Sequence, residues 1–104
     1  MAGLYREGGK MLRVVIVEDE LKEAERLQSF LKRFEAENGI VFEIEIYSSA
    51  LTFLANYKQD TDLVLMDIEL PDVNGMEICR RLRKTDNRVA IIFVTNMARC
   101  RKRL

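Results

Sequence analysis

The amino-acid sequence predicts an α/β fold in which a doubly wound parallel sheet carries helices on both faces. Short apolar runs rich in Val and Ile alternate with longer segments whose apolar residues recur at helical spacing. Strands separated by helices have to run parallel, because each crossover leads the chain back to the same end of the sheet. The length of 104 residues, with 48% hydrophobic and 33% charged residues, fits one globular domain.

The first strand and the first helix follow from two different apolar patterns. Leu12 to Val17 is an apolar, β-branched run of the kind that lies buried in a parallel sheet. A helix is predicted from Leu21 to Glu37, and Asn38 and Gly39 are a suitable end for it, because glycine tolerates the left-handed conformation. The predicted buried face of this helix consists of Leu21, Ala24, Leu27, Leu31 and Phe34.

The second strand, Ile40 to Tyr47, alternates apolar and acidic residues. Glu43 and Glu45 fall on one face, which predicts an edge strand with a solvated side. Ser48 and Ser49 can cap a second helix, which is predicted to run to about Lys58. The predicted buried residues of this helix are Leu51, Leu54 and Tyr57.

Two further strands flank a third helix. Leu63 to Met66 is a short buried strand, and Val89 to Val94 is an apolar strand without charge. Between them, a helix is predicted from about Met76 to Lys84. Its predicted buried residues are Met76, Cys79 and Leu82. With an expected strand order of 2-1-3-4, Val89 to Val94 becomes an edge, and an apolar edge favours self-association.

Composition excludes several kinds of chemistry and of location. The absence of histidine rules out histidine-based triads and histidine metal ligands. Cys79 and Cys100 match no zinc or redox spacing and are expected to be free thiols. No apolar run approaches the roughly 20 residues that span a bilayer, and residues 1–10 contain no signal peptide. We therefore expect a cytoplasmic protein without a membrane partner, in which residues 1–10 form a flexible leader.

The net charge of zero conceals a gradient along the chain. Residues 1–79 carry 8 basic and 16 acidic groups, whereas residues 80–104 carry 9 basic groups and 1 acidic group. The basic end is either a solvated tail or a local contact with nucleic acid.

Polar residues follow three of the predicted strands: Glu18 and Asp19, then Asp67, then Thr95. The carboxyl ends of parallel strands meet at one edge of the sheet, where such sheets bind ligands. Clustered carboxylates repel one another, and a hard cation such as Mg²⁺ (or Mn²⁺) relieves the repulsion while leaving room for phosphate oxygens. A carboxylate beside such a metal can also attack phosphorus and form an aspartyl phosphate. A simpler interpretation is that Glu18 and Asp19 only favour the start of the following helix.

Three segments carry a resemblance to a known family: VVIVEDE at residues 14–20, LVLMDIELPDVNG at residues 63–75 and IFVT at residues 92–95. With them the chain resembles the receiver domain of bacterial two-component response regulators, most of all the receivers attached to LytTR-type DNA-binding domains. The resemblance implies a phosphorelay in which Asp67 accepts a phosphoryl group from a sensor histidine kinase. It also implies a Mg²⁺ site formed by Asp19, Asp67 and the backbone carbonyl of Glu69, with Glu18 as a nearby acid. The remaining matches are Thr95 to the switch hydroxyl and Pro71 and Gly75 to the residues that shape the loop.

The family pattern continues beyond this resemblance with a fifth strand that bears a lysine and with a last helix. No residue of this sequence matches that lysine. We therefore expect a flavodoxin-like receiver domain over residues 11–104 that lacks the last strand, the last helix and a DNA-binding output domain. A truncated or frameshifted product would have this form.

Three functions remain open at this point. The first is a phosphoacceptor domain, which is a switch and at most catalyses its own phosphorylation and dephosphorylation. The second is a degenerate receiver that acts only as an interaction module. The third is a Mg²⁺-dependent phosphohydrolase, for which Glu69 would have to act as general acid. An Asp67 adduct formed from a small phosphodonor and Mg²⁺ separates the first from the second, and turnover of a phosphate ester favours the third.

Overall fold

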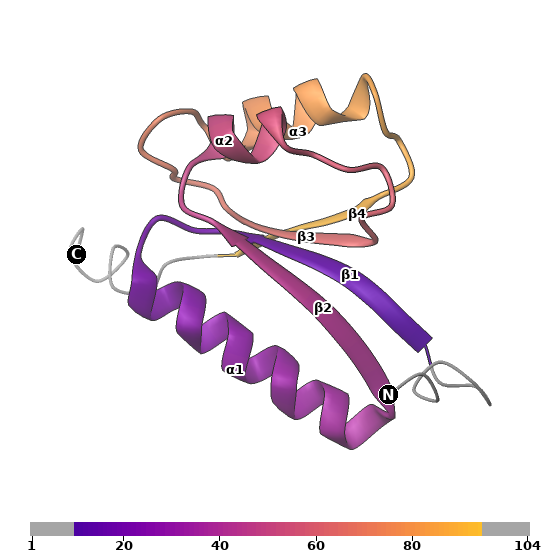
Figure 1. Cartoon of the computed structure of the whole chain (residues 1–104). Coiled ribbons are helices and arrows are strands. Elements are labelled where there is room, and N and C mark those ends of the chain that lie inside the picture. Colours follow the sequence, from indigo (N-terminus) through magenta and orange to yellow (C-terminus); the bar gives the residue numbers. More distant parts are fainter. Residues whose placement is uncertain (1–9, 95–104) are drawn as a thin grey trace.

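A computed structural model describes residues 10–94 of the protein and contains one parallel sheet (Figure 1). Its strands are β1 (Lys10–Val17), β2 (Ile40–Tyr47), β3 (Leu63–Asp67) and β4 (Ala90–Val94). The strand order is β2-β1-β3-β4, and every neighbouring pair is parallel. The predicted order 2-1-3-4 is therefore confirmed, and each strand lies within two residues of its predicted bounds. Lys10, which was predicted to be the last residue of the flexible leader, belongs to β1. Residues 1–9 of that leader and Thr95 lie outside the described residues.

The helices cover both faces of the sheet, as a doubly wound fold requires. Figure 1 shows α1 (Leu21–Asn38) on one face, with α2 (Ala50–Ala55) and α3 (Gly75–Arg83) on the other. The α1 helix ends at Gly39, which has a φ of 66° and donates its backbone N–H to the carbonyl of Glu35. That conformation is left-handed, so glycine ends this helix for the predicted reason.

Each face of the sheet has its own apolar core. The two cores arise because successive side chains of a strand point to opposite faces. The core under α1 contains Val14, Ile16, Ala24, Leu27, Leu31 and Leu65. The core under α2 and α3 contains Val15, Val17, Ala50, Phe53, Val64, Met66, Leu70, Ile78, Leu82 and Val89.

The predicted buried face of α1 is confirmed in its middle and wrong at its ends. Ala24, Leu27 and Leu31 are buried, but Leu21 is 70% exposed. Phe34 is 40% exposed, although its ring stacks on Phe42 with the centroids 6.2 Å apart. An 18-residue helix is about 27 Å long, and the apolar core beneath it covers only residues 24–31.

The prediction for α2 was wrong in its length and wrong in part in its buried face. The helix ends at Ala55 and not near Lys58, because Asn56 turns its side-chain amide to the carbonyl of Thr52 and ends the helix. Ala50 and Phe53 are the fully buried residues, whereas Leu51 is exposed. Leu54 and Tyr57, which were predicted to be buried, are half-buried and pack against the same core. Spacing alone allowed several neighbouring faces, and the aromatic contacts of Phe53 with Tyr47 and Tyr57 select the observed one.

The buried face of α3 was also predicted wrongly in part. Leu82 is buried as expected, but Ile78 takes the place of the predicted Met76, which is 51% exposed, and Cys79 is half-buried. The reason is the helix phase. Residues four apart share a face, so Ile78 and Leu82 face the sheet together, and Met76, two positions before Ile78, points away from it.

The edge strands differ in charge. The β2 edge carries Glu43 and Glu45, whereas β4 carries no charged residue and leaves Ile92 51% exposed.

Within residues 10–94, no helix is both long enough and apolar enough to span a membrane.

Candidate functional site

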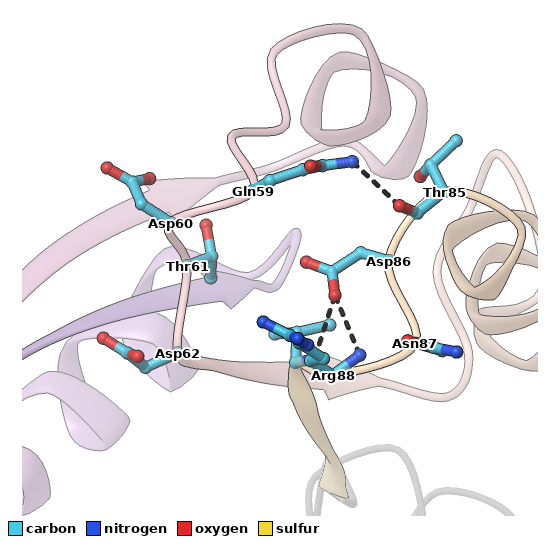
Figure 2. Close-up of a pocket in the computed structure, with 9 residues that line it drawn as sticks. Gln59, Asp60, Thr61, Asp62, Thr85, Asp86, Asn87 and Arg88 are labelled. Carbon is cyan, nitrogen blue, oxygen red and sulfur yellow. Dashed lines mark hydrogen bonds between the residues drawn. The ribbon is translucent and has the colours of Figure 1, made fainter.

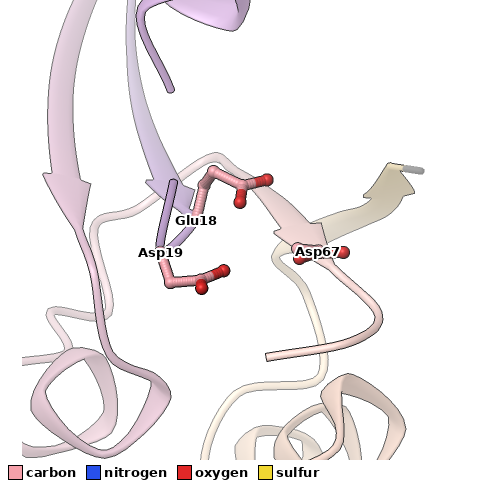
Figure 3. A group of neighbouring side chains, drawn as sticks. All are labelled: Glu18, Asp19 and Asp67. Carbon is pink, nitrogen blue, oxygen red and sulfur yellow. The ribbon is translucent and has the colours of Figure 1, made fainter. Parts of the chain in front are cut away.

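Three carboxylates that are distant in the sequence meet at the carboxyl edge of the sheet. Figure 3 shows Glu18 and Asp19 just beyond the end of β1, with Asp67 at the end of β3. One oxygen from each residue lies within 4.8 Å of the others. Glu18 and Asp67 are each only 2% exposed, and Asp19 is half-buried. The predicted convergence of these three acids is present in the structure.

The strand register and local hydrogen bonds place these acids. Val17 pairs with Met66 across β1 and β3, so the residues that follow emerge side by side. The Glu20 N–H donates to Glu18 Oε2 at 3.1 Å, and the Glu69 N–H donates to Asp67 Oδ1 at 3.2 Å. Each bond reaches back two residues, as in an Asx-type turn, and therefore fixes the rotation of its carboxylate.

The electrostatics of the cluster favour either a proton or a cation. Burial raises the pKa of the Glu18 carboxyl to about 7; the charges of Asp67 and Asp19 add to the rise, and the hydrogen bond from Glu20 opposes it. Buried like charges disfavour ionisation. A bound cation would relieve the same repulsion.

The donor set fits Mg²⁺. Three carboxylate oxygens within 4.8 Å are hard ligands of the type this ion prefers, and Mg²⁺ usually takes one or two carboxylates and keeps several waters. Asp19 and Asp67 are therefore residues that could hold it, with Glu18 close by. The alternative role as a helix cap has less support, because the N-cap of α1 is Glu20, whose side chain makes no capping hydrogen bond.

The loop after Asp67 is held tightly at its far end by Gly75. A Cβ atom at this position would lie 2.9 Å from the Asp67 carbonyl oxygen and 3.1 Å from the Ile68 Cα. The Gly75 N–H donates to the Ile68 carbonyl at 2.9 Å. The absence of a side chain therefore lets the start of α3 touch the backbone of Asp67, which is a physical reason for the glycine predicted to shape this loop.

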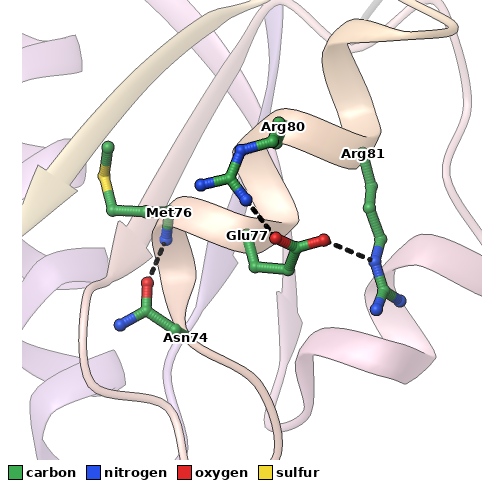
Figure 4. A network of polar contacts seen from close by, with 5 residues as sticks. All are labelled: Asn74, Met76, Glu77, Arg80 and Arg81. Atoms are coloured by element: carbon green, nitrogen blue, oxygen red, sulfur yellow. Dashed lines mark hydrogen bonds and ion pairs between the residues drawn. The ribbon is translucent and has the colours of Figure 1, made fainter.

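Asn74 begins α3 beside this contact. Its Oδ1 accepts a hydrogen bond from the Met76 N–H at 2.7 Å, and Figure 4 shows this cap together with the side chain of Glu77, which pairs with Arg80 and Arg81. Asn74 was not predicted as a site residue, although an Asn just before a helix is a recognisable cap signal.

The other predicted site residues lie around the same loop. Glu69 is half-buried two residues beyond Asp67, and Pro71 is exposed within the loop. Asp72, in the same loop, was not predicted as a site residue. It bonds to residues 21 to 23 positions earlier in the chain, and no local pattern announces such a contact.

A hollow of about 440 Å³ lies at the opposite, amino-end edge of the sheet (Figure 2). Several of its polar groups already have partners. Gln59 donates its side-chain amide to the Thr85 carbonyl at 2.8 Å, and Asp86 accepts from the backbone of Arg88 and Val89. Asp60 pairs with Arg13 at 3.0 Å. The hollow therefore offers weaker grounds for a ligand site than the acidic cluster does.

The fold and the acidic edge agree with the result of comparison with known proteins. Residues 14–103 match the response regulator receiver domain family. This match covers most of the chain, so the chain belongs to the response regulator receiver domain family, whose members are signalling domains of two-component systems.

Sequence similarity to individual proteins agrees with this family assignment. The chain is 39% identical over 85 residues to the sensory transduction protein LytT of Bacillus anthracis, covering 82% of this chain and 33% of that protein. It is 43% identical over 82 residues to the aerobic respiration control protein ArcA of Escherichia coli K12, covering 79% and 32%. The chain thus spans about a third of the length of these relatives.

Solved structures share the fold. The non-phosphorylated HemR receiver domain from Leptospira biflexa matches with a TM-score of 0.68 at 24% identity, over 86% of this chain and 72% of that one. The MaeR response regulator bound to beryllium trifluoride matches with a TM-score of 0.63 at 32% identity, over 82% and 67%. A complex of the histidine kinase ThkA with the response regulator TrrA matches with a TM-score of 0.63 at 29% identity, over 82% and 69%.

Proposed function

We propose that the chain is a phosphoacceptor that receives a phosphoryl group on Asp67 from a sensor histidine kinase. The observation that carries the proposal is the convergence of Glu18, Asp19 and Asp67 at the carboxyl edge of a receiver-type sheet. The relative bound to beryllium trifluoride and the relative in complex with a histidine kinase support it.

The transfer itself needs little from the protein beyond placement and charge. An Asp67 oxygen attacks the phosphorus of a phosphohistidine; the new P–O bond forms as the P–N bond breaks, and the electron pair of that bond stays on the imidazole nitrogen. The Glu69 N–H holds the carboxylate in one rotation during the attack. Bound Mg²⁺ would offset the charge on the transferring phosphoryl oxygens.

The direct test is the position of the adduct. The protein is treated with acetyl phosphate or beryllofluoride in the presence of Mg²⁺, and the modified residue is mapped by mass spectrometry. We expect the modification on Asp67, its loss in Asp67→Asn, and its retention in the control Asp62→Asn, which alters a carboxylate at the other edge of the sheet. An adduct on Glu18 or Glu69 would refute the assignment.

The metal site makes a separate prediction. Asp19→Asn removes one hard ligand, and we expect Mg²⁺ affinity to fall by at least about tenfold, since even partners outside the ligand shell cost 10–100-fold. Titration followed by intrinsic tyrosine fluorescence or NMR measures the affinity, with Asp62→Asn as the matched control. Equal affinities in Asp19→Asn and the unaltered protein would remove Asp19 from the site.

The adduct mapping and the Mg²⁺ titration also test two alternative functions. A degenerate receiver that serves only as an interaction module would bind no Mg²⁺ at this edge and form no Asp67 adduct. A Mg²⁺-dependent phosphohydrolase would turn over a generic phosphate ester, with Glu69 as general acid. The half-buried Glu69 follows β3 in the loop, where its backbone N–H is engaged with Asp67, which gives this role less support.

The partners follow from the site and from the edge of the sheet. We propose a sensor histidine kinase as the phosphodonor, in the cytoplasm, and a second copy of the chain as a partner along β4. The second proposal rests on charge. Antiparallel pairing of β4 with itself about Ile92 brings only apolar side chains together, whereas the same pairing of β2 about Ile44 would set Glu43 against Glu45.

A further inference from the structure

Asp72 links the loop of the candidate site to a separate helix. Its Oδ2 accepts from the Ser49 hydroxyl at 2.9 Å and from the Leu51 N–H at 3.0 Å. Its Oδ1 accepts from the Ala50 N–H at 3.4 Å. These donors belong to the N-cap residue and the first two residues of α2, so a carboxylate that follows Asp67 by five residues supplies the N-terminal acceptor of a helix on the preceding crossover.

The charged form of Asp72 is the form that makes these contacts. Partial burial acts to raise the pKa of the Asp72 carboxyl, but the hydrogen bonds from Leu51, Ser49 and the neighbouring backbone outweigh it, and the pKa is lowered. Charge-assisted hydrogen bonds of this kind are stronger than neutral ones. Asp72 therefore holds α2 while it is ionised.

The α2 helix depends on its contact with Asp72 more than a longer helix would. It has only six residues, well below the length at which a helix is stable on its own. Ser49 caps it locally, since its Oγ accepts from the Thr52 N–H at 3.3 Å, and the same hydroxyl donates to Asp72. Phe53 then fixes the helix in the apolar core that also contains Met66, the residue before Asp67.

The loop that contains Asp72, between Asp67 and Gly75, is anchored at both ends to the candidate site. Glu69 is bonded to Asp67, and Gly75 is bonded to Ile68 and touches the Asp67 carbonyl. Asp72 lies between these anchors. A change in the loop around Asp67 therefore displaces Asp72 relative to α2, and hydrogen bonds near 3 Å tolerate little displacement.

We propose that Asp72 is a positioning residue that couples the occupancy of the Asp67 site to the order of α2. A phosphoryl group on Asp67 tightens the loop and strengthens the Asp72 contact with α2; by reciprocity, loss of that contact weakens binding at Asp67 by the same factor. The inference rests on the proposed function of Asp67.

Hydrogen exchange of single backbone amides, followed by NMR with and without beryllofluoride and Mg²⁺, tests the coupling. In the unaltered protein we expect exchange at Leu51 to slow by at least about fivefold on adding beryllofluoride. In Asp72→Ala we expect the free protein to exchange about fivefold faster at Leu51, as after loss of a helix cap. We also expect beryllofluoride to change that rate less than twofold in Asp72→Ala and to bind it at least about fivefold more weakly.

Two controls isolate the effect. Asp62→Ala also removes a carboxylate that accepts a backbone N–H, from Arg13 at 2.9 Å, but far from the site, and should leave the Leu51 response intact. Asp72→Asn keeps one acceptor oxygen and serves if Asp72→Ala does not fold; it should show a reduced response.

The outcomes separate the two claims. If beryllofluoride binds but the Leu51 rate does not change, or changes equally in Asp72→Ala, the coupling is wrong and the phosphoacceptor assignment stands. If the unaltered protein forms no beryllofluoride adduct at all, the phosphoacceptor assignment fails, and the coupling fails with it.

Discussion

Among single residues, Gly39 and Gly75 are glycines for different physical reasons. Gly39 has a positive φ and nothing within 4 Å of a built Cβ, whereas Gly75 has an ordinary φ and a Cβ site blocked by backbone atoms. The first position needs conformational freedom, and the second needs space.

Asparagine substitutions distinguish these reasons. Gly39→Asn should cost less than about 1 kcal/mol in the free energy of unfolding, because Asn tolerates the left-handed region. Gly75→Asn should cost about 1–3 kcal/mol, because overpacking against backbone forces the start of α3 away from Asp67. Urea unfolding measures both, and equal costs would contradict the steric account of Gly75.

Asp86 is a single residue that should make the stability of the fold depend on pH. The hydrogen bond from the Tyr57 hydroxyl lowers the pKa of Asp86 most; the backbone N–H groups of Arg88 and Val89 and the charge of Arg83 act in the same direction, while burial opposes them. A carboxyl whose pKa is lower in the folded state stabilises the fold above its unfolded pKa, and this contribution is lost as pH falls through the folded pKa.

We therefore expect Asp86→Asn to be less stable than the unaltered protein at pH 7, and the difference to shrink as the pH falls below about 4, where the Asp86 carboxyl becomes protonated in the unfolded chain before it does in the folded protein. Urea unfolding from pH 7 to pH 3 gives the comparison. Tyr57→Phe keeps the ring contact with Phe53 but removes the donor, so it should weaken the pH dependence. A difference between Asp86→Asn and the unaltered protein that stayed constant over this range would contradict the proposed role of the charge.

Among the elements, α2 is the one whose face depends most on packing. Its six residues offer Leu51, Phe53 and Leu54 as alternative apolar contacts, and the fold buries Phe53 completely. Phe53 touches Tyr47 at the end of β2 and Tyr57 beyond the helix, so one ring connects α2 with its two flanking segments.

Truncation of each side chain tests this assignment. Phe53→Ala should cost about 3–5 kcal/mol in the free energy of unfolding, as expected for a fully buried aromatic residue. Leu51→Ala, the matched change on the exposed side, should cost less than about 1 kcal/mol. Chemical denaturation measures both values, and a larger loss for Leu51→Ala would restore the face that the sequence pattern first indicated.

For the whole molecule, the two sheet edges are unequal. Both β2 and β4 expose an isoleucine, Ile46 and Ile92, but only β2 carries acidic residues. Like charges placed opposite each other across an antiparallel pair are destabilising, so β2 is protected against pairing with itself. Within the described residues, β4 has no such protection.

We expect the 104-residue protein to self-associate at roughly 50 µM, a weak interaction on the usual scale of affinities. Ile92→Lys should make it monomeric by placing two ammonium groups opposite each other, whereas Ile46→Lys on the other edge should leave association unchanged. Sedimentation velocity distinguishes these cases. A monomer for the unaltered protein, or equal association of both variants, would contradict pairing through β4; a monomer would also fit coverage of this edge by another part of the chain.

The order of elements, the parallel sheet and the acids at the strand ends could all be predicted from local sequence patterns. These features depend on short-range periodicity and on the rule that parallel strands end at one edge, and both can be read without coordinates. The convergence of Asp19 and Asp67, 48 positions apart, followed from this rule alone.

In contrast, the choice of buried helix faces and of the loop residues that support the site depends on packing between distant segments. Two helices each offer a pair of apolar residues for burial, namely Met76 and Ile78 in α3 and Leu51 and Phe53 in α2. Only packing against the sheet selects the member of each pair that is buried. The bond from Ser49 to Asp72 joins two crossovers 23 positions apart, and the lack of room for a Cβ at Gly75 depends on where Asp67 lies. These features arise from contacts between segments distant in the chain, so no local pattern could predict them.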